Sequence, residues 1–182
     1  MGMKRLTVAA FVALALVAVA NAASYGSPSR TYISTRYHYS LPVPAGLKLV
    51  PAKADQLYGF FPSSPSPEVD FYGTGLANDS KGIAVASVAL PAGTSLEGWV
   101  TTNLRAIAQQ FSCHVPTRRA TTLDGAPAVE LVYAPSCFGN FDTIEVVSGG
   151  RGYDVYWLGP VSTRSQDQAQ FHADIKAFRF TR

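Results

Sequence analysis

The residue types that could support acid–base chemistry are few, and their spacing completes no known catalytic arrangement. Glu68 and Asp70 lie two positions apart, so in a strand they would share one face. Hydrolysis of a glycosidic bond by paired carboxylates needs a second acid across a cleft, and the sequence locates none. His38 lies in a candidate strand among tyrosines, where a surface position is the ordinary expectation. The alternative hypothesis is therefore a cryptic hydrolase or transferase that uses Glu68, Asp70 or His38.

The motif content favours a protein without a catalytic centre. The sequence contains no Gly-x-Ser-x-Gly, Ser-x-x-Lys, His-Glu-x-x-His, Cys-x-x-Cys or P-loop motif. The glycines at positions 73–75 and 149–152 lack the strand–turn–helix context of a nucleotide-binding loop and predict turns. We therefore expect no enzyme activity, no cofactor and no metal site.

The two cysteines of the chain, Cys113 and Cys137, are predicted to form a disulfide. Asp124-Gly125 between two strand-like segments is a strong hairpin signal, so paired positions should sum to 249. Cys113 then falls opposite Ser136, one place from Cys137. Closing this loop should stabilise the fold by about 3 kcal/mol. Free thiols are the alternative.

The first 22 residues have the organisation of a secretory signal peptide. Lys4 and Arg5 precede an apolar run over residues 6–20, and Ala20-Asn21-Ala22 supplies an Ala-x-Ala cleavage site. A membrane anchor is the competing interpretation, but spanning a bilayer takes about 20 apolar residues and this run is shorter. We expect cleavage after Ala22, export to the periplasm or the medium, and no stable membrane insertion afterwards.

Composition then describes one ordinary domain. The chain has 182 residues, 47% of them hydrophobic, and a formal net charge of +3. Cleavage would remove Lys4 and Arg5 but no acidic residue, which lowers the charge to +1 and argues against a nucleic-acid partner. About 160 residues remain, enough for one domain with a substantial core. Two cysteines are too few for a disulfide-rich scaffold or a four-cysteine zinc site.

Strand signals dominate the first half of the mature chain. Residues 23–36 are polar and rich in Ser and Tyr, and they predict a flexible lead-in before a domain over residues 37–182. Alternating or apolar segments predict strands at residues 37–41, 56–61, 69–75 and 82–90. The proline-rich segment 62–67 predicts a loop, because proline cannot donate to a sheet.

Two helices and two hairpins follow. Thr94 and Glu97 form a capping box before a stripe of apolar residues that runs to Phe111 and contains Trp99. A second capping box at residues 165–168 opens a helix whose apolar face is Phe171, Ile175 and Phe178. Residues 117–123 pair with 126–133, and residues 141–148 pair with 153–158. In the second hairpin we expect Ile144 opposite Trp157 and Val146 opposite Val155. This order predicts an α+β domain, a central antiparallel sheet with helices packed on it.

Three segments resemble the PsbP-like fold family, which includes the photosystem II extrinsic subunit and DcrB-like bacterial envelope proteins. They are the opening strand with its Pro-x-Gly ending, the hairpin signature and the final helix with its aromatic tail: Tyr39-Ser-Leu41-Pro-Val43-Pro44-Ala-Gly46-Leu47, Leu123-Asp-Gly125-Ala-Pro127-Ala128 and Phe178-Arg-Phe180. The resemblance covers about residues 37–182. It implies an α/β/α sandwich and a family whose members mostly bind other proteins and share no catalytic residues.

The leading hypothesis is an exported, non-enzymatic accessory or binding protein of the cell envelope. Its partner would be an envelope protein or a small ligand; a structural envelope component is a further alternative. Three surfaces are candidates for contact, on grounds of aromatic or loop composition: the N-terminal tyrosines Tyr32, Tyr37 and Tyr39, the loop at residues 62–67, and the loop at residues 137–140 with Phe138.

Overall fold

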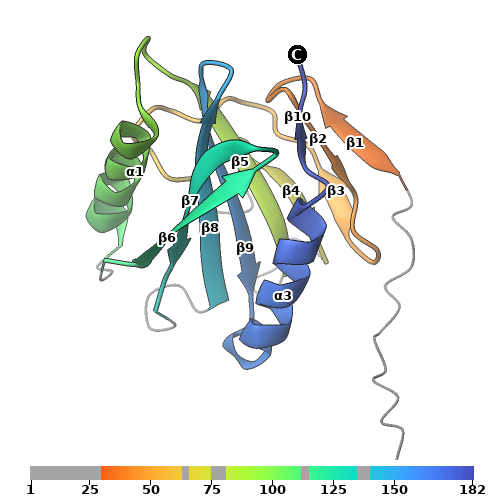
Figure 1. The fold of residues 1–182 in the computed structure, drawn as a ribbon. Coiled ribbons are helices and arrows are strands. Elements are labelled where there is room, and N and C mark those ends of the chain that lie inside the picture. The colour runs from red at the N-terminus through yellow and green to blue at the C-terminus, as the bar shows by residue number, and fades with distance from the viewer. Residues whose placement is uncertain (1–29, 63–65, 75–80, 112–114, 135–139) are drawn as a thin grey trace, which may run out of the picture.

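Seven antiparallel strands form the central sheet in the order β3-β4-β5-β9-β8-β7-β6 (Figure 1). The computed structural model describes residues 30–62, 66–74, 81–111, 115–134 and 140–182. The strands of this sheet are β3 (Lys48–Val50), β4 (Asp70–Gly73), β5 (Gly82–Ala89), β6 (Thr117–Leu123), β7 (Ala126–Val132), β8 (Asn140–Ser148) and β9 (Arg151–Gly159). The predicted strand at residues 82–90 is confirmed as β5, which lies inside the sheet and is buried at all but its last position.

Helices cover both faces of this sheet. Helix α1 (Leu96–Gln110) lies on one face, where Val100 and Ile107 are buried against the sheet. Helix α3 (Arg164–Ile175) lies on the other, next to a smaller sheet of β1 (Thr31–Ser34), β2 (Tyr39–Pro42) and β10 (Arg179–Phe180). A short 3-10 helix, η1 (Val161–Thr163), leads into α3. The predicted α+β sandwich is confirmed.

Both helices begin close to the predicted position, but with different caps. Ser95, not Thr94, caps α1, because its hydroxyl oxygen accepts the Gly98 N–H at 3.1 Å. The Thr94 hydroxyl donates instead to the Pro91 carbonyl at 2.7 Å. Glu97 does not reach back to the cap, because it pairs with Arg118 of β6. Helix α3 likewise starts at Arg164, one residue before the predicted cap.

The first hairpin has the predicted register and the second does not. Leu123 faces Ala126 across Asp124-Gly125, as the sum of 249 requires. In the second hairpin, however, Ser148 faces Arg151, so Ile144 pairs with Val155 and Val146 pairs with Tyr153. The predicted partners were wrong by two residues. Gly149 and Gly150 have φ values of 58° and 74°, so these two residues close the turn alone and Arg151-Gly152 belong to the strand.

The segments before β4 depart most from the predictions. Residues 31–34 form β1 and pair with β2, so they are not part of a flexible lead-in. The predicted strand at residues 56–61 is a loop, held by the Gln56 N–H bonded to the Ser87 carbonyl at 3.3 Å. Cys113, Cys137 and Phe138 lie outside the described residues, so the disulfide stays a prediction.

Candidate functional site

Two of the three N-terminal tyrosines are core residues, so the three do not form an exposed contact patch. Tyr37 and Tyr39 are both fully buried, so their assignment to a partner surface was wrong. The Tyr39 ring stacks on Phe178 with centroids 4.9 Å apart, which joins β2 to the segment after α3. Burial raises the pKa of both phenols. Tyr32 alone remains partly exposed, at one edge of this cluster.

The carboxylate beneath these tyrosines is Asp70, at the start of β4. It is buried, and it accepts hydrogen bonds from the Ser34 hydroxyl at 2.7 Å, the Ala52 N–H at 2.7 Å and the Tyr39 hydroxyl at 2.9 Å. Its role is to satisfy donors that the small sheet directs inward. These bonds hold β1 and β2 against the central sheet.

The three residues hypothesised to be catalytic are not joined to one another by any hydrogen bond or ion pair. His38 lies exposed in the turn between β1 and β2, with φ 55°, and its carbonyl accepts the Thr181 N–H at 2.8 Å. All three side chains are described, and no hydrogen bond or ion pair joins any two of His38, Glu68 and Asp70. The sequence-based alternative of a hydrolase or transferase therefore gains no geometric support from these residues.

A second acidic cluster lies buried beneath α1. The Asn103 side-chain amide donates to Glu145 at 2.7 Å and to Asp154 at 2.6 Å, and the Gln56 amide donates to Asp154 at 2.8 Å. Glu145 and Asp154 are also hydrogen-bonded to each other, and burial raises the pKa of both carboxyl groups. Because Glu145 and Asp154 are fully buried, a substrate cannot touch them in this structure. This cluster is a buried polar network that joins α1 to β8 and β9.

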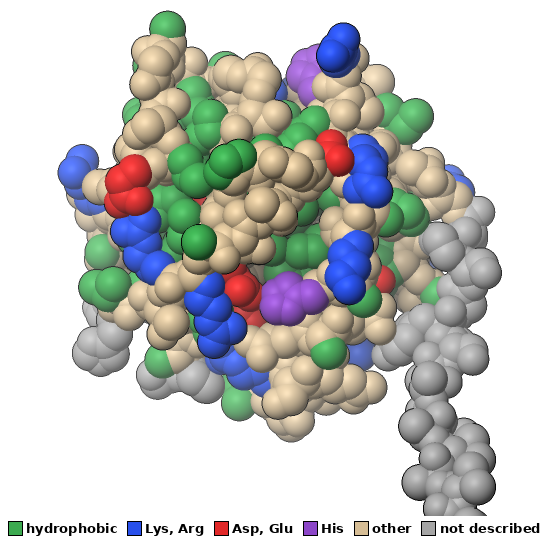
Figure 2. All heavy atoms as spheres, viewed as in Figure 1, with side chains coloured by type: hydrophobic (Ala, Val, Ile, Leu, Met, Phe, Trp, Pro, Cys, Tyr) green, Lys and Arg blue, Asp and Glu red, His purple; other side chains and the backbone are tan. Residues whose placement is uncertain are grey.

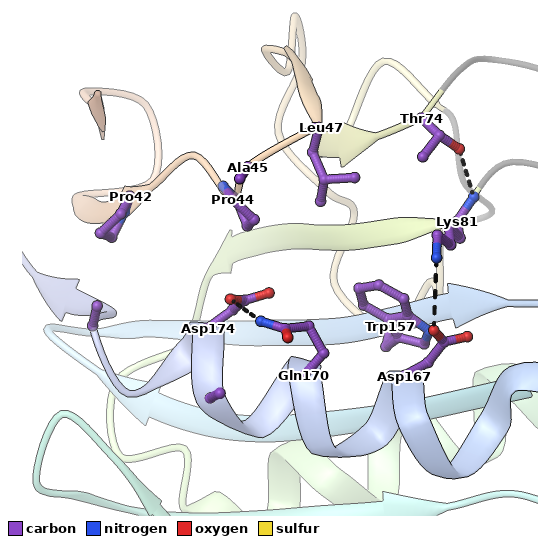
Figure 3. A pocket seen from close by; sticks show the side chains of 13 residues that line it. Pro42, Pro44, Ala45, Leu47, Thr74, Lys81, Trp157, Asp167, Gln170 and Asp174 are labelled. Atoms are coloured by element: carbon purple, nitrogen blue, oxygen red, sulfur yellow. Dashed lines mark hydrogen bonds and ion pairs between the residues drawn. The ribbon is translucent and has the colours of Figure 1, made fainter. Parts of the chain in front are cut away.

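A groove of about 480 Å³ opens between α3, the β2–β3 connection and the end of β9 (Figure 3). We call it the α3 groove. It is lined by Pro42, Pro44, Ala45, Gly46, Leu47, Thr74, Lys81, Trp157, Asp167, Gln170, Ala173, Asp174 and Ala177. Most of these side chains are apolar, and the polar ones come largely from α3.

Local structure explains how these residues meet. Helix α3 directs Phe171 and Ile175 into the core. Gln170 and Asp174 each precede one of these residues and are four positions apart, so they share a neighbouring face of the helix, and that face lines the groove. The opposite wall is the β2–β3 connection, which is stiffened by Pro42 and Pro44. A turn closed by the Leu47 N–H on the Pro44 carbonyl at 3.1 Å brings this wall back toward β3.

Two polar atoms of the α3 groove have no partner among the described residues. Trp157 is only 3% exposed, and its buried indole nitrogen donates to no acceptor among the described residues. The Asp174 Oδ2 atom is likewise buried without a donor, whereas its Oδ1 atom accepts the Gln170 amide at 2.8 Å. Burial raises the pKa of Asp174. At the other end, the Lys81 ammonium lies 3.9 Å from Asp167.

No motif in the sequence predicted the α3 groove. Its residues come from segments that are distant in the sequence. Taken separately, these segments predict only turns, strand ends and a solvent-exposed helix face. The sequence did contain the run Pro42-Val43-Pro44-Ala45-Gly46, which predicts a rigid connection. It does not predict which element packs opposite this connection.

A more open, charged depression lies on the other side of α3. The His172 Nε2 atom is 2.7 Å from the Glu130 carboxylate of β7, and Lys176, Arg179 and Asp124 line the rim. On the face drawn in Figure 2, a histidine lies beside acidic side chains, with Lys and Arg side chains near them. Both of its carboxylates have partners, since Glu130 pairs with His172 and the Asp124 carboxylate accepts the Phe180 N–H at 2.9 Å. Among the described residues, no buried side-chain atom without a partner belongs to the lining of this depression, in contrast to the α3 groove.

Three apolar side chains of the loop over α1 are exposed. Leu57 is 71% exposed, and Tyr58 and Phe60 are also open to solvent. The Tyr58 ring lies 6.1 Å from Trp99 of α1, which fixes this loop against the helix. This loop precedes the predicted contact loop at residues 62–67, of which residues 63–65 lie outside the described part.

Within the described residues no group of three His, Cys, Asp or Glu side chains is placed to hold a metal ion. In the same residues no helix is long and apolar enough to cross a membrane.

Comparison with known proteins gives a structural match. Neither a family model nor a curated protein matches the sequence. Among solved structures, the chain is similar to the solution structure of cyanobacterial PsbP (CyanoP) from Synechocystis sp. PCC 6803, with a TM-score of 0.58 and 15% identity. The match covers 89% of this chain and 98% of the cyanobacterial one. The chain therefore has a PsbP-like fold.

Proposed function

We propose that this protein is an exported accessory protein that acts by binding a small ligand in the α3 groove. The observation that carries the proposal is the pairing of an apolar cavity of about 480 Å³ with buried polar atoms that lack partners. Ligand pockets are mostly apolar cavities of about 300–1,000 Å³ with a few polar groups that orient the ligand.

The free-energy cost of leaving buried polar atoms without partners supports this proposal. A buried hydrogen-bonding group without a partner costs about 1–3 kcal/mol, so proteins seldom retain one without a reason. Trp157 and Asp174, whose indole nitrogen and Oδ2 atom lack partners among the described residues, both line the same groove. A ligand that satisfies both atoms would recover this cost on binding.

A binding role agrees with the other acidic sites. Asp70 is saturated by hydrogen bonds within the fold, and Glu145 and Asp154 are sealed beneath α1. Export is the second part of the proposal and rests on the signal-like residues 1–22. The family that the sequence resembles acts mostly through binding, which supports the proposal by analogy of fold.

Retention of small molecules from a metabolite extract of the producing cells tests the proposal. The purified protein is incubated with the extract, washed and denatured, and the released compounds are identified by mass spectrometry. Ala173→Trp fills the groove from an exposed position on α3, and Ala169→Trp adds the same ring on α3 outside the lining residues. We expect at least one compound to be retained by wild type and by A169W but lost in A173W. Equal retention by both variants, or no retention by wild type, would overturn the proposal.

A protein partner is the second candidate, and the exposed Leu57, Tyr58 and Phe60 favour it. Such a cluster of exposed apolar side chains is more typical of an interface than of a free loop. A photo-crosslinking residue at Leu57 should then give a discrete adduct in the envelope, whereas the same residue at the exposed Ala120 of β6 should not. Identical adduct patterns at both positions would remove this candidate.

A further inference from the structure

We infer that the α3 groove binds an elongated apolar molecule that carries an amine at one end and an oxygen acceptor about 10 Å away. This inference rests on the proposed function and names the chemical class of the ligand. Three features of the groove determine it: an unpaired carboxylate oxygen, an unpaired indole N–H and an apolar wall between them.

The amine is assigned by Asp174. Among the described residues no Lys or Arg forms an ion pair with this carboxylate, and its Oδ2 atom is buried without a donor. The side chain has one hydrogen bond, from the neutral Gln170 amide. Burial without a cation raises the pKa of Asp174, so an ammonium group placed beside Oδ2 would be stabilised by the charge that it neutralises. An anionic group at this end would instead meet a like charge.

The acceptor is assigned by Trp157. An indole N–H is a donor only, and here it is buried with no acceptor among the described residues. Figure 3 shows the Trp157 ring between Gln170 and the Lys81–Asp167 pair. The Lys81 ammonium is a second donor at this end of the groove, 3.9 Å from Asp167. A carbonyl or carboxylate oxygen would satisfy the indole and remain close to the lysine.

The spacing follows from helix geometry. Asp167 marks the Lys81 end of the groove and Asp174 the other, and seven residues separate them on α3. At 1.5 Å per residue this separation is about 10 Å along the helix axis. A molecule that meets both ends must therefore be extended rather than compact.

The middle of the ligand must be apolar. Between the two ends the groove is walled by Pro44 and Leu47 on one side, and on the other by Ala173 of α3 and by Ala177, which follows the helix. Burying methylene groups against such a wall contributes to binding, whereas a polar chain would lose hydration without gaining partners.

Titration with 8-aminooctanoate tests this inference, because its amine and carboxylate are separated by an apolar chain of about the required length. The chain contains two tryptophans, so the spectrum of the ¹⁵N-labelled protein has two indole N–H signals, and Trp157→Phe assigns one of them. We expect the Trp157 signal to move on binding. We also expect octanoate, octylamine and 4-aminobutanoate each to bind at least tenfold more weakly, since each lacks the amine, the acceptor or the length.

Asp174→Asn is the matched variant, because the amide keeps the shape and can still accept from Gln170. It should weaken 8-aminooctanoate at least tenfold and leave octanoate unchanged. Asp124→Asn, which changes a carboxylate outside the α3 groove, should affect neither probe.

Other outcomes overturn the ligand class without touching the proposed function. Equal affinity for octanoate would exclude the amine, and equal affinity for 4-aminobutanoate would exclude the spacing. The absence of a Trp157 shift with all four probes would exclude the whole class. The extract experiment with A173W decides separately whether the groove binds any ligand.

Discussion

Replacing Glu145 by glutamine should flatten the pH dependence of folding stability. Glu145 and Asp154 are fully buried, hydrogen-bonded to each other and bridged by the Asn103 amide. Among the described residues neither carboxyl group has a cationic partner. If both carboxyl groups were ionised, their adjacent negative charges would repel each other strongly. The pair therefore retains a proton at pH values where exposed carboxyl groups have lost theirs. The amide of the variant can replace that proton as a donor to Asp154.

The size of the effect follows from one bound proton. The folded pKa of Glu145 is raised well above the ordinary value of 4.5, with burial as the largest cause. At pH values between 4.5 and the raised pKa of Glu145, the folded protein holds a proton that the unfolded chain has released. Its contribution to stability is complete below pH 4.5 and is lost as the pH rises through the folded pKa. One proton corresponds to about 1.4 kcal/mol per pH unit in the free energy of unfolding.

Urea unfolding from pH 5 to pH 8 measures this slope. We expect wild type to lose stability relative to Glu145→Gln by up to about 1.4 kcal/mol per pH unit within that window. Glu68→Gln removes a carboxylate outside the cluster and is the control for the loss of one negative charge. A difference between wild type and Glu145→Gln that stays constant from pH 5 to pH 8 would refute the shared proton.

Three further predictions concern packing, the cysteines and export. Gly152→Ala should lower the free energy of unfolding by about 1–3 kcal/mol, because the added methyl carbon would lie 2.6 Å from the buried Trp99 ring; an unchanged urea midpoint would contradict this. The unfolded, non-reduced protein should contain no free thiol, and reduction of a Cys113–Cys137 bond should cost about 3 kcal/mol; a thiol assay that finds two would exclude the bond. The intact mass of protein from the envelope fraction should correspond to a chain beginning at Ala23, and an unprocessed mass would contradict the predicted signal peptide.

Local signals predicted those elements that depend on neighbouring residues. Asp124-Gly125 fixed the first hairpin register because Asp124 and Gly125 both have positive φ, at 48° and 78°, as a two-residue turn requires. The unbroken apolar run of β5 predicted its central place in the sheet. The second hairpin shows the limit, since four glycine-rich residues can form either a four-residue or a two-residue turn.

Long-range contacts decided what local patterns could not. Tyr37 is buried because its hydroxyl lies 2.7 Å from the carbonyl oxygens of Ala54 and Glu68, which are distant in the sequence. Gln56 interrupts a strand-like segment because its side chain turns inward to Asp154. The α3 groove could not be predicted for the same reason, because its two unpaired polar atoms become visible only when β9 and α3 are side by side.

The pairing of β10 with β2 would set an order of events if the chain is exported as proposed. Ser40 pairs with Arg179 and Tyr39 with Phe180, so the strand leading into the proline wall of the groove is held by the last strand of the fold (Figure 1). Contacts between such distant segments carry a large cost in loop-closure entropy. If export proceeds with the amino end first, the wall could not be completed until residues 179–180 had crossed the membrane. The proposed ligand binding would then be restricted to the far side.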